Sequence, residues 1–510
     1  MASRVLGLVR DQVLAYYFGA GYAMDAFLVA FRIPNLVRDL FAEGAMSAAF
    51  VPTFTKRLAG EGRESAWRLA NSVINALIVV TGVLVLLAVV FAEPLLRPFA
   101  EGFTDTPGKF ELTVQLTRAM MPFLTLVGLA AALMGMLNAL GHFFVPALSP
   151  AMFNVGTIVC ALTLVPLAPQ LGIEPIFAIA VGTIVGGLGQ LLLQWPPLAR
   201  EGFHYTPSLD RKDPGLRQIL ILMGPGTIGL AATQVNLLVN TMLATNEDGA
   251  VSWLNYAFRL MYLPIGLFGV SIATAATPAM SRLAHDQDYP RMRATIAHAL
   301  GLMLMLNVPA TLGLIALAVP IIALIFEHGI FTAADTAATA AALRWYAVGL
   351  VGYSVVRIVS PTFYALGKSR IPVAVSVISV LLNVALNLIL VRTMGYRGLA
   401  LGTSLAALLN AGVQLILLRR ELGGIEGRRV TVTLVKIIVA SVVMAATAWA
   451  SDVWLVQLFP DASLLAQGLR VAGSILIAVI VLALAATILR IHEFEEARDM
   501  IVGRLRRMTR

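Results

Sequence analysis

Long runs of apolar residues, separated by short polar or glycine- and proline-containing segments, make up most of this 510-residue chain. A helix that crosses the hydrocarbon core of a membrane needs about 20 mostly apolar residues. The pattern predicts an all-α polytopic membrane protein with about 14 transmembrane helices. They are expected at about 1–18, 24–54, 70–98, 113–140, 146–168, 174–197, 214–244, 249–281, 295–326, 337–366, 371–392, 397–418, 431–456 and 465–489.

The composition excludes a soluble globular protein, because 59% of the residues are hydrophobic and only 13% are charged. Soluble domains have about 45–50% apolar and about 25% charged residues. The net charge of +9 does not require a nucleic-acid partner, since the positive excess of a polytopic membrane protein lies in its cytoplasmic loops. The single cysteine, Cys160, lies in an apolar run and excludes both an intrachain disulfide and a thiolate metal cluster.

The distribution of Lys and Arg between alternate loops predicts the orientation. One set of loops holds seventeen of them and the C-terminal tail on the same side adds six, whereas the opposite loops hold only Arg97, Lys109, Arg392 and Arg397. Cytoplasmic loops carry the excess of positive charge. We therefore expect both termini on the cytoplasmic side of a bacterial inner membrane.

An internal repeat divides the chain. The stretch Ala139-Leu140-Gly141 with Pro146 recurs 226 residues later as Ala365-Leu366-Gly367 with Pro372, and Ala30-Phe31-Arg32 recurs 227 residues later as Ala257-Phe258-Arg259. Gly172 and Gly186 likewise match Gly398 and Gly412. Six helices separate the copies, so they are expected to be parallel repeats.

The repeat predicts two parallel six-helix lobes followed by two C-terminal helices. The expected parts are an N-terminal lobe at 1–200, a C-terminal lobe at 214–420, two further lipid-facing helices within 431–489, and a basic, amphipathic cytoplasmic tail at 490–510. The helix of the second copy begins near Pro214, which aligns upstream of Met1, so the first helix is expected to lack about a dozen residues.

Enzyme signatures are missing from the sequence. It contains no HExxH, no GxSxG, no Walker A loop and no paired-cysteine metal motif, and its six histidines are scattered. We expect a transporter rather than an enzyme.

Charged residues inside the expected spans are the strongest functional signal. A mid-membrane arginine costs about 2.5–3.5 kcal/mol on insertion scales, so a group of them must line a water-filled cavity or pair with acids. Arg38 and Asp39 are adjacent and are expected to point in different directions along a helix. The candidate substrate-binding residues are Arg4, Arg10, Arg32, Arg38, Arg259, Asp25 and Glu43.

Two interpretations of these charges remain open. Asp11, Asp25, Asp39 and Glu43 could each neutralise one arginine in a structural ion pair. Alternatively, the arginines bind an anionic, phosphorylated substrate, because guanidinium groups suit bidentate binding of phosphate.

A second polar group lies in the other lobe. Asn383 and Asn387 are one turn apart, and Asn240 and Thr403 lie on neighbouring expected helices. Their oxygens could ligate a sodium ion, or they could simply join helices by hydrogen bonds. The helices at 431–456 and 465–489 have no repeat partner. They could form a lipid-facing wall, a groove for a long acyl or prenyl chain, or packing support alone.

The opening of the chain resembles that of the MurJ (MviN) family. The matching segments are Ser3-Arg4-Val5-Leu6-Gly7-Leu8-Val9-Arg10-Asp11, Phe18-Gly19-Ala20-Gly21, Asp25-Ala26-Phe27, Phe31-Arg32-Ile33-Pro34-Asn35-Leu36-Val37-Arg38 and Phe41-Ala42-Glu43-Gly44-Ala45. Members of this family are lipid II flippases of the multidrug/oligosaccharidyl-lipid/polysaccharide (MOP) exporter superfamily. The fourteen-helix layout extends the resemblance over essentially the whole chain.

The resemblance implies that the substrate is lipid II, the undecaprenyl-pyrophosphate-linked disaccharide-pentapeptide, moved to the periplasmic leaflet for peptidoglycan synthesis by alternating access. The partners it implies are lipid II and membrane lipid. The family's essential arginines fall on Arg4, Arg10, Arg38 and Arg259, and its acids fall on Asp25 and Glu43.

The family's sodium ligands fall on Asn240, Asn383, Asn387, Thr403 and the carbonyl of Leu399. Asn240 and Asn387 stand where those members have aspartates, so a sodium site here is expected to be weak.

Three other functions are less consistent with the sequence. A drug/cation antiporter of the same superfamily needs acidic residues in its cavity, whereas these are basic. A flippase for another polyprenyl-linked oligosaccharide usually has twelve helices. A membrane glycosyltransferase needs acidic loop motifs, which the sequence lacks.

Overall fold

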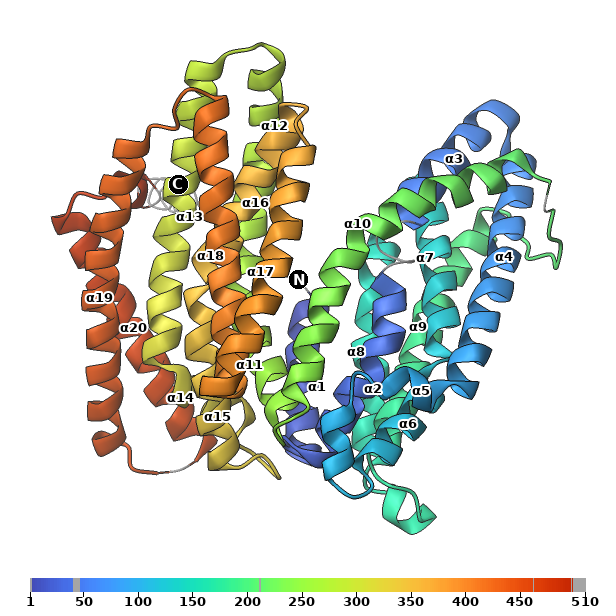
Figure 1. The fold of residues 1–510 in the computed structure, drawn as a ribbon, viewed down its shortest axis with the longest axis horizontal. Coiled ribbons are helices and arrows are strands. Elements are labelled where there is room, and N and C mark those ends of the chain that lie inside the picture. The colour runs from blue at the N-terminus through green and yellow to red at the C-terminus, as the bar shows by residue number, and fades with distance from the viewer. Residues whose placement is uncertain (1, 40–45, 211, 462, 497, 499–510) are drawn as a thin grey trace, which may run out of the picture. The chain divides into compact units, whose positions relative to one another are not determined.

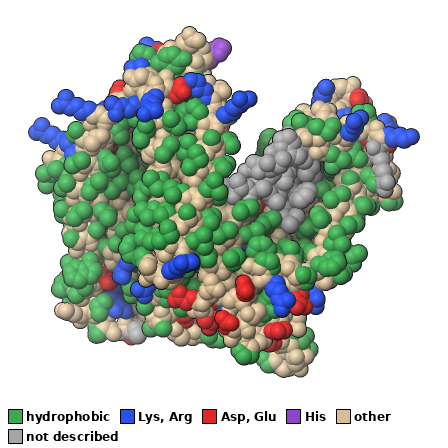
Figure 2. All heavy atoms as spheres, in the orientation of Figure 1, with side chains coloured by type: hydrophobic (Ala, Val, Ile, Leu, Met, Phe, Trp, Pro, Cys, Tyr) green, Lys and Arg blue, Asp and Glu red, His purple; other side chains and the backbone are tan. Residues whose placement is uncertain are grey.

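The structure is a computed structural model that describes residues 2–39, 46–210, 212–461, 463–496 and 498. Every regular element in these ranges is helical, and Figure 1 shows them as long, mostly antiparallel rods. Within unit 2 a broad band of hydrophobic side chains separates two charged ends (Figure 2), as a membrane-spanning surface requires. The predicted all-α polytopic fold class is confirmed.

The helices group into two compact units. Unit 1 comprises Met1–Ser252 and Gly329–Phe331, and unit 2 comprises Trp253–His328 and Thr332–Arg510. The elements that begin in unit 1 are α1 (Ala2–Phe18), α2 (Tyr22–Arg38), α3 (Met46–Glu61), α4 (Arg63–Val90), α5 (Ala92–Leu96), η2 (Glu101–Asp105), α6 (Lys109–Met120), α7 (Phe123–Ala139), α8 (Phe144–Leu164), η3 (Ala168–Leu171), α9 (Phe177–Arg200), α10 (Pro214–Ala244) and α11 (Ala250–Pro264).

The remaining elements belong to unit 2, together with most of α11. They are η4 (Ile265–Gly269), α12 (Val270–His285), α13 (Tyr289–Ala316), α14 (Ala318–Phe326), α15 (Ala333–Val348), α16 (Leu350–Ala365), α17 (Arg370–Met394), α18 (Tyr396–Glu421), α19 (Gly427–Leu458) and α20 (Leu464–Ile488). Ten helices among the described residues are long and apolar enough to cross a membrane.

The order of elements repeats, as the sequence predicted. A span that breaks near a proline comes second in each copy, as α2 followed by α3 and as α11 followed by η4 and α12. A long helix with a short continuation follows, as α4–α5 and α13–α14, then a span made of two pieces, as α6–α7 and α15–α16. The main core of unit 1 packs α3, α4, α7 and α9 together, and the main core of unit 2 packs their equivalents α12, α13, α16 and α18.

The repeated glycines confirm the equivalence at one point. Gly141 ends α7 at φ 82° and Gly367 ends α16 at φ 71°, in the left-handed region that favours glycine. The amide that follows each glycine donates to a carbonyl five residues earlier, His142 to Leu137 and Lys368 to Phe363, both at 2.9 Å.

Another repeated glycine pair differs in role. A Cβ on Gly186 would lie 2.8 Å from the backbone of Phe153, so α9 and α8 approach there at glycine distance. A Cβ on Gly412 would meet nothing within 4 Å. Unit 2 instead makes its close contact at Gly352, where a Cβ would lie 2.7 Å from the backbone of Ala407 in α18. Gly186 and Gly412 are therefore equivalent in the repeat, but only Gly186 makes a close contact between helices.

A polar cluster ties the loops of unit 1 together at one end. His142 Nε2 lies 2.9 Å from Glu201 Oε1, and Arg63 Nη1 lies 3.1 Å from Glu201 Oε2. These contacts hold the pKa of Glu201 below its usual range, with the hydrogen bond to His142 as the larger cause. The cluster fixes the end of α9 against the α7–α8 turn and the start of α4.

The two units are defined by contacts between residues, whereas the repeat is defined by sequence. The boundaries of the units therefore differ from those of the repeat. Helix α10, at 214–244, belongs to unit 1 by its contacts with α3, α4 and α2. The predicted lobe boundaries at 200 and 214 therefore stay a prediction about the repeat. In the tail, residues 491–496 continue from α20, with Ile491 buried, and residues 499–510 lie outside the described residues.

Candidate anion-binding site

Arg10 of α1 is held in place by its chain neighbour and by an aromatic ring. Its Nε and Nη2 donate to the same oxygen of Asp11, Oδ1, at 3.1 and 2.7 Å. Its guanidinium carbon lies 5.3 Å from the ring centroid of Phe153 in α8. Phe153 stacks in turn on Phe31 of α2. The guanidinium therefore covers the edge of an aromatic core that joins α1, α2 and α8.

Arg38, at the end of α2, makes the same kind of contact. Its Nε and Nη2 donate to Oδ1 of Asp39 at 3.2 and 2.8 Å. The other carboxylate oxygen of Asp39 accepts from Asn35 and from Gln234 of α10, both at 3.3 Å. The expectation that Arg38 and Asp39 point in different directions was wrong. A long arginine side chain reaches around the helix, and the low dielectric strengthens the attraction that draws it there.

Two further arginines of the predicted set lie on the same two helices. Arg32 Nε donates to Thr241 Oγ1 of α10 at 3.2 Å, which links α2 to α10. Arg4 lies in the first part of α1 and is exposed. The neighbouring carbonyl of Ser3 accepts from Asn154 of α8 at 3.1 Å. Arg4 and Arg10 therefore lie on α1, and Arg32 and Arg38 lie on α2, all within unit 1.

Asp25 has a different environment from the arginines. Its side chain is fully buried in α2 and pairs with Lys109 of α6 at 2.9 Å. It also accepts from the amides of Gly249 and Ser252 at 2.8 and 2.9 Å, and from the Ser252 hydroxyl at 2.6 Å. In this conformation the carboxylate is enclosed. Its oxygens accept hydrogen bonds from Lys109 of α6 and from Gly249 and Ser252 at the start of α11, so it does not line an open site.

Lys109 is a structural residue that the sequence reasoning assigned to a loop. Its side chain is 1% exposed and also contacts Asp248. Its ammonium lies 4.3 Å from the ring centroid of Phe103. Lys109 begins a helix right after a Gly-containing turn, so charge counting placed it outside the membrane. No sequence signal distinguished it from an exposed loop lysine.

Unit 2 contributes Arg259 of α11, the repeat equivalent of Arg32, which is half-buried. It also contributes Arg357 of α16, which sequence reasoning missed. Arg357 donates to the hydroxyl of Tyr262 and lies 5.6 Å from the centroid of that ring. Tyr262 follows Arg259 by three residues, so the two lie on one face of α11. An arginine in the middle of an apolar run was the signal that could have found Arg357.

The candidate sodium ligands lie on three helices, with Asn240 on α10, Asn383 and Asn387 on α17, and Leu399 and Thr403 on α18. Asn387 Nδ2 donates to Asn383 Oδ1 at 3.2 Å, and Thr403 Oγ1 donates to the Leu399 carbonyl at 2.7 Å. Asn383 Oδ1 and the Leu399 carbonyl accept these hydrogen bonds, and the set carries no formal charge, whereas hard cations favour carboxylates. Asn240, on α10, belongs to unit 1. Both hydrogen bonds join residues one turn apart on the same helix, the first on α17 and the second on α18.

Glu43, the last member of the predicted substrate-binding set, lies outside the described residues. Whether Arg259 meets the arginines of unit 1 stays a prediction. The described arginines that contact neighbours are thus each held in a defined direction, by a carboxylate, a hydroxyl or a ring.

The comparisons with known proteins agree on one family. The sequence model of the family described as "Lipid II flippase MurJ" matches residues 14–467. A probable lipid II flippase MurJ of Vibrio cholerae is 37% identical over 418 residues, which cover 80% of this chain and 79% of the relative. The lipid II flippase MurJ of Burkholderia cenocepacia is 34% identical over 426 residues, which cover 82% of each.

Solved structures give the same result. A lipid II flippase MurJ in an inward closed conformation superposes with a TM-score of 0.78 at 27% identity and covers 98% of both chains. An inward-facing multidrug transporter of the MATE family, in the MOP superfamily, superposes with a TM-score of 0.70 at 16% identity and covers 83% of this chain and 96% of its own. At that identity the second match shows a common fold alone.

The buried ion pair makes a stability prediction. Lys109→Met leaves the Asp25 carboxylate uncompensated and should destabilise the protein by about 3–5 kcal/mol. Asp25→Asn should cost less, because its carbonyl oxygen still accepts from Ser252. The thermal unfolding midpoints of both variants and of the double variant measure the coupling. Lys436→Met is the matched control, since Lys436 donates only to a carbonyl at the surface. Additive effects of the two substitutions would contradict a coupled pair.

Proposed function

This chain belongs to the MurJ family of lipid II flippases, and on that premise we propose that its intramembrane arginines hold the pyrophosphate of lipid II during transport. It is a multi-pass membrane protein that moves lipid II between the leaflets of a bacterial membrane. The proposed direction is from the cytoplasmic to the periplasmic leaflet, for peptidoglycan synthesis. The proposed site comprises Arg4, Arg10, Arg32, Arg38 and Arg259, to which we add Arg357.

The orientation of the guanidinium groups carries this proposal. Asp11 and Asp39 each engage Nε and Nη2 of one arginine through a single oxygen. A guanidinium has five N–H groups in a rigid fork. A guanidinium that is already fixed in one direction loses less conformational entropy on binding a phosphate than a mobile guanidinium does. Pre-oriented forks on α1 and α2 therefore suit a pyrophosphate, whose oxygens diverge from two phosphorus atoms.

The low dielectric of the membrane favours charged donors, such as arginine, over uncharged donors for binding a pyrophosphate. A pyrophosphate brought from water into an apolar span loses its hydration shell, and only charged donors offset that loss. Arginine hydrogen bonds to a charged acceptor contribute about 1.5–3 kcal/mol each. We propose that Asp25, enclosed by Lys109 and Ser252, supports this arrangement from behind by fixing α2 rather than by touching the substrate. Glu43 stays in the proposed set as an acidic partner.

Substitution of the arginines should separate binding from folding. Arg38→Ala and Arg259→Ala should each lower lipid II flipping by about tenfold or more, because a charged hydrogen bond contributes about 1.5–3 kcal/mol. Arg38→Lys should also lose most activity, since the charge remains but the fork does not. Flipping and membrane abundance are to be measured in the same cells, in a strain whose own lipid II flippase can be depleted.

The matched control is Arg68→Ala, because Arg68 is exposed near the start of α4 and its ion pair among the described residues is with Glu64, at 3.8 Å. Loss of abundance in Arg38→Ala that Asp39→Asn restores would show a structural ion pair instead. Normal flipping by a stable Arg38→Ala, Arg259→Ala double variant would refute the phosphate-binding role.

Asn240, Asn383 and Asn387 are neutral amides, which bind sodium less strongly than carboxylates do. We therefore propose that flipping does not depend on sodium bound to them. Exchange of sodium for potassium at low millimolar concentration should leave flipping unchanged. Asn387→Asp combined with Asn240→Asp supplies two carboxylates and should introduce a sodium response, because hard cations favour carboxylate oxygens. A sharp sodium requirement in the unsubstituted protein would contradict this proposal.

The Lys and Arg asymmetry supports an orientation with both termini in the cytoplasm. In a Cys160→Ser background, Glu426→Cys should react with a membrane-impermeant thiol reagent only after permeabilisation of the inner membrane. Asp105→Cys, on the opposite side of the predicted layout, should react in intact cells. Both positions are exposed, so access decides the outcome. Labelling of the cysteine at position 426 in intact cells would reverse the orientation.

A further inference from the structure

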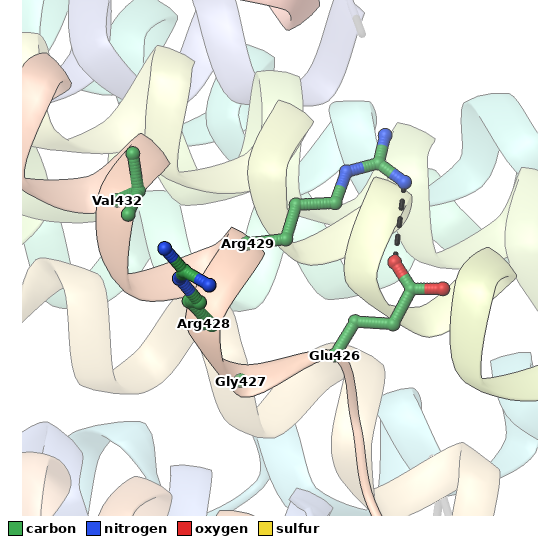
Figure 3. Close-up of a pocket in the computed structure, with 5 residues that line it drawn as sticks. All are labelled: Glu426, Gly427, Arg428, Arg429 and Val432. Atoms are coloured by element: carbon green, nitrogen blue, oxygen red, sulfur yellow. Dashed lines mark hydrogen bonds and ion pairs between the residues drawn. The ribbon is translucent and has the colours of Figure 1, made fainter.

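A shallow, open groove lies at the start of α19, far along the chain from every residue of the proposed transport site. It has a volume of about 610 Å³ and is lined by Glu426, Gly427, Arg428, Arg429 and Val432. Figure 3 shows Arg428 on the same side of the helix as Val432, while Arg429 turns away toward Glu426. Arg429 Nη1 lies 3.2 Å from Glu426 Oε2, and both side chains are more than one-third exposed.

From Val432, which lines the groove, an exposed apolar face of α19 continues down the helix. Val432, Val435, Val439 and Val443 follow Arg428 at intervals of three or four residues, so they share its face of α19. Their exposed fractions are 48%, 55%, 48% and 47%. The face is therefore uncovered in this chain over about four turns. In a membrane protein the solvent for such a face is the acyl chains of lipids.

The length of α19 places the two arginines at the level of lipid headgroups. Trp449 and Trp454, toward the other end of the helix, are 62% and 56% exposed, and exposed tryptophans mark the membrane–water interface. At 1.5 Å per residue, Arg428 lies about 31–39 Å from them along the helix. The hydrocarbon core is about 30 Å thick, and about 40–45 Å with the headgroups. Arg428 therefore falls in the opposite headgroup layer.

The surrounding charge favours an anion at this point. On the face drawn in Figure 2, Lys and Arg side chains gather over the end of unit 2 where α18 ends and α19 begins. Arg419 and Arg420 lie in the last turn of α18, nine and eight residues before Arg428. Among the residues that line the groove, Glu426 is the one carboxylate, and it pairs with Arg429.

From these observations we infer a binding site for one anionic phospholipid. Arg428 and Arg429 bind the headgroup phosphate, and an acyl chain lies on the valine face below. Basic clusters at the cytoplasmic ends of membrane helices recognise anionic headgroups in this way. A zwitterionic lipid binds less well, since its own ammonium competes for the phosphate charge. Glu426 opposes the lipid by holding Arg429. With the orientation proposed above, the lipid belongs to the cytoplasmic leaflet.

Native mass spectrometry of the delipidated full chain in detergent tests the site. Dioleoyl-phosphatidylglycerol and dioleoyl-phosphatidylcholine are titrated separately, and the ratio of their first binding constants is the readout. Near a membrane each arginine contributes about 1 kcal/mol toward an anionic lipid, or about fivefold. Arg428→Gln with Arg429→Gln should therefore lower the ratio by about fivefold or more. Arg68→Gln, on unit 1, is the matched control and should leave it unchanged.

Glu426→Gln supplies a test in the opposite direction. It releases Arg429 from its ion pair and should raise the preference for phosphatidylglycerol by up to about fivefold. This variant decides the question if the double arginine variant fails to fold. Inorganic phosphate, added at the concentration of the lipid, should not displace phosphatidylglycerol, because it cannot use the valine face.

Four results would overturn the site. They are an unchanged ratio in the double arginine variant, an equal loss in Arg68→Gln, no gain in Glu426→Gln, and displacement of the lipid by inorganic phosphate. None of them bears on the arginines of the transport site, because the readout is lipid binding and not flipping.

Discussion

Compensation of buried charge where α2, α6 and α11 begin is the constraint on which unit 1 depends. Asp25 and Lys109 are 0% and 1% exposed and lie 2.9 Å apart, on helices that are 84 residues distant in sequence. An isolated charge in such a place is strongly unfavourable, and a buried pair is tolerated only when further hydrogen bonds satisfy both partners. The amides of Gly249 and Ser252 and the ring of Phe103 complete that set. Three segments of the chain are thereby fixed at one point.

The duplication explains why this compensation differs between the two halves. Both copies keep the same order of helices and the same packing of four equivalent helices in the core. Side chains within that common frame have diverged. Arg32 of one copy binds a hydroxyl of α10, while its equivalent Arg259 lies beside Tyr262, which binds Arg357. A stable helical frame tolerates such changes because its stability rests on apolar packing and not on these polar groups.

The sequence predicted the frame well and the polar contacts only in part. Hydropathy and the glycine matches suffice for the helices, because burial in a membrane imposes a simple length rule. The contact of Arg38 with Asp39 was missed, since helix geometry alone separates neighbours by about 100° and ignores the reach of a guanidinium. Arg357 did carry a sequence signal, because it lies in the middle of an apolar run, whereas Lys109 was missed for a different reason. Whether a charge is buried depends on which helices pack beside it, and no pattern within one span carries that information.

The way each arginine is held has a consequence for transport. Arg10 and Arg38 pair with the next residue of their own helix, so each pair moves with that helix as one body. The contacts of Asp25 with Lys109, of Arg32 with Thr241 and of Asp39 with Gln234 instead join different helices. Where helices of unit 1 shift against each other, only contacts of the second kind break or exchange partners, whereas movement of the unit as one body leaves both kinds intact. Pairing within a helix keeps each guanidinium compensated throughout, so the transporter avoids the cost of about 2.5–3.5 kcal/mol that an uncompensated arginine incurs in the membrane. The same arrangement keeps the forks pointing in one direction relative to their helices, whichever leaflet they face.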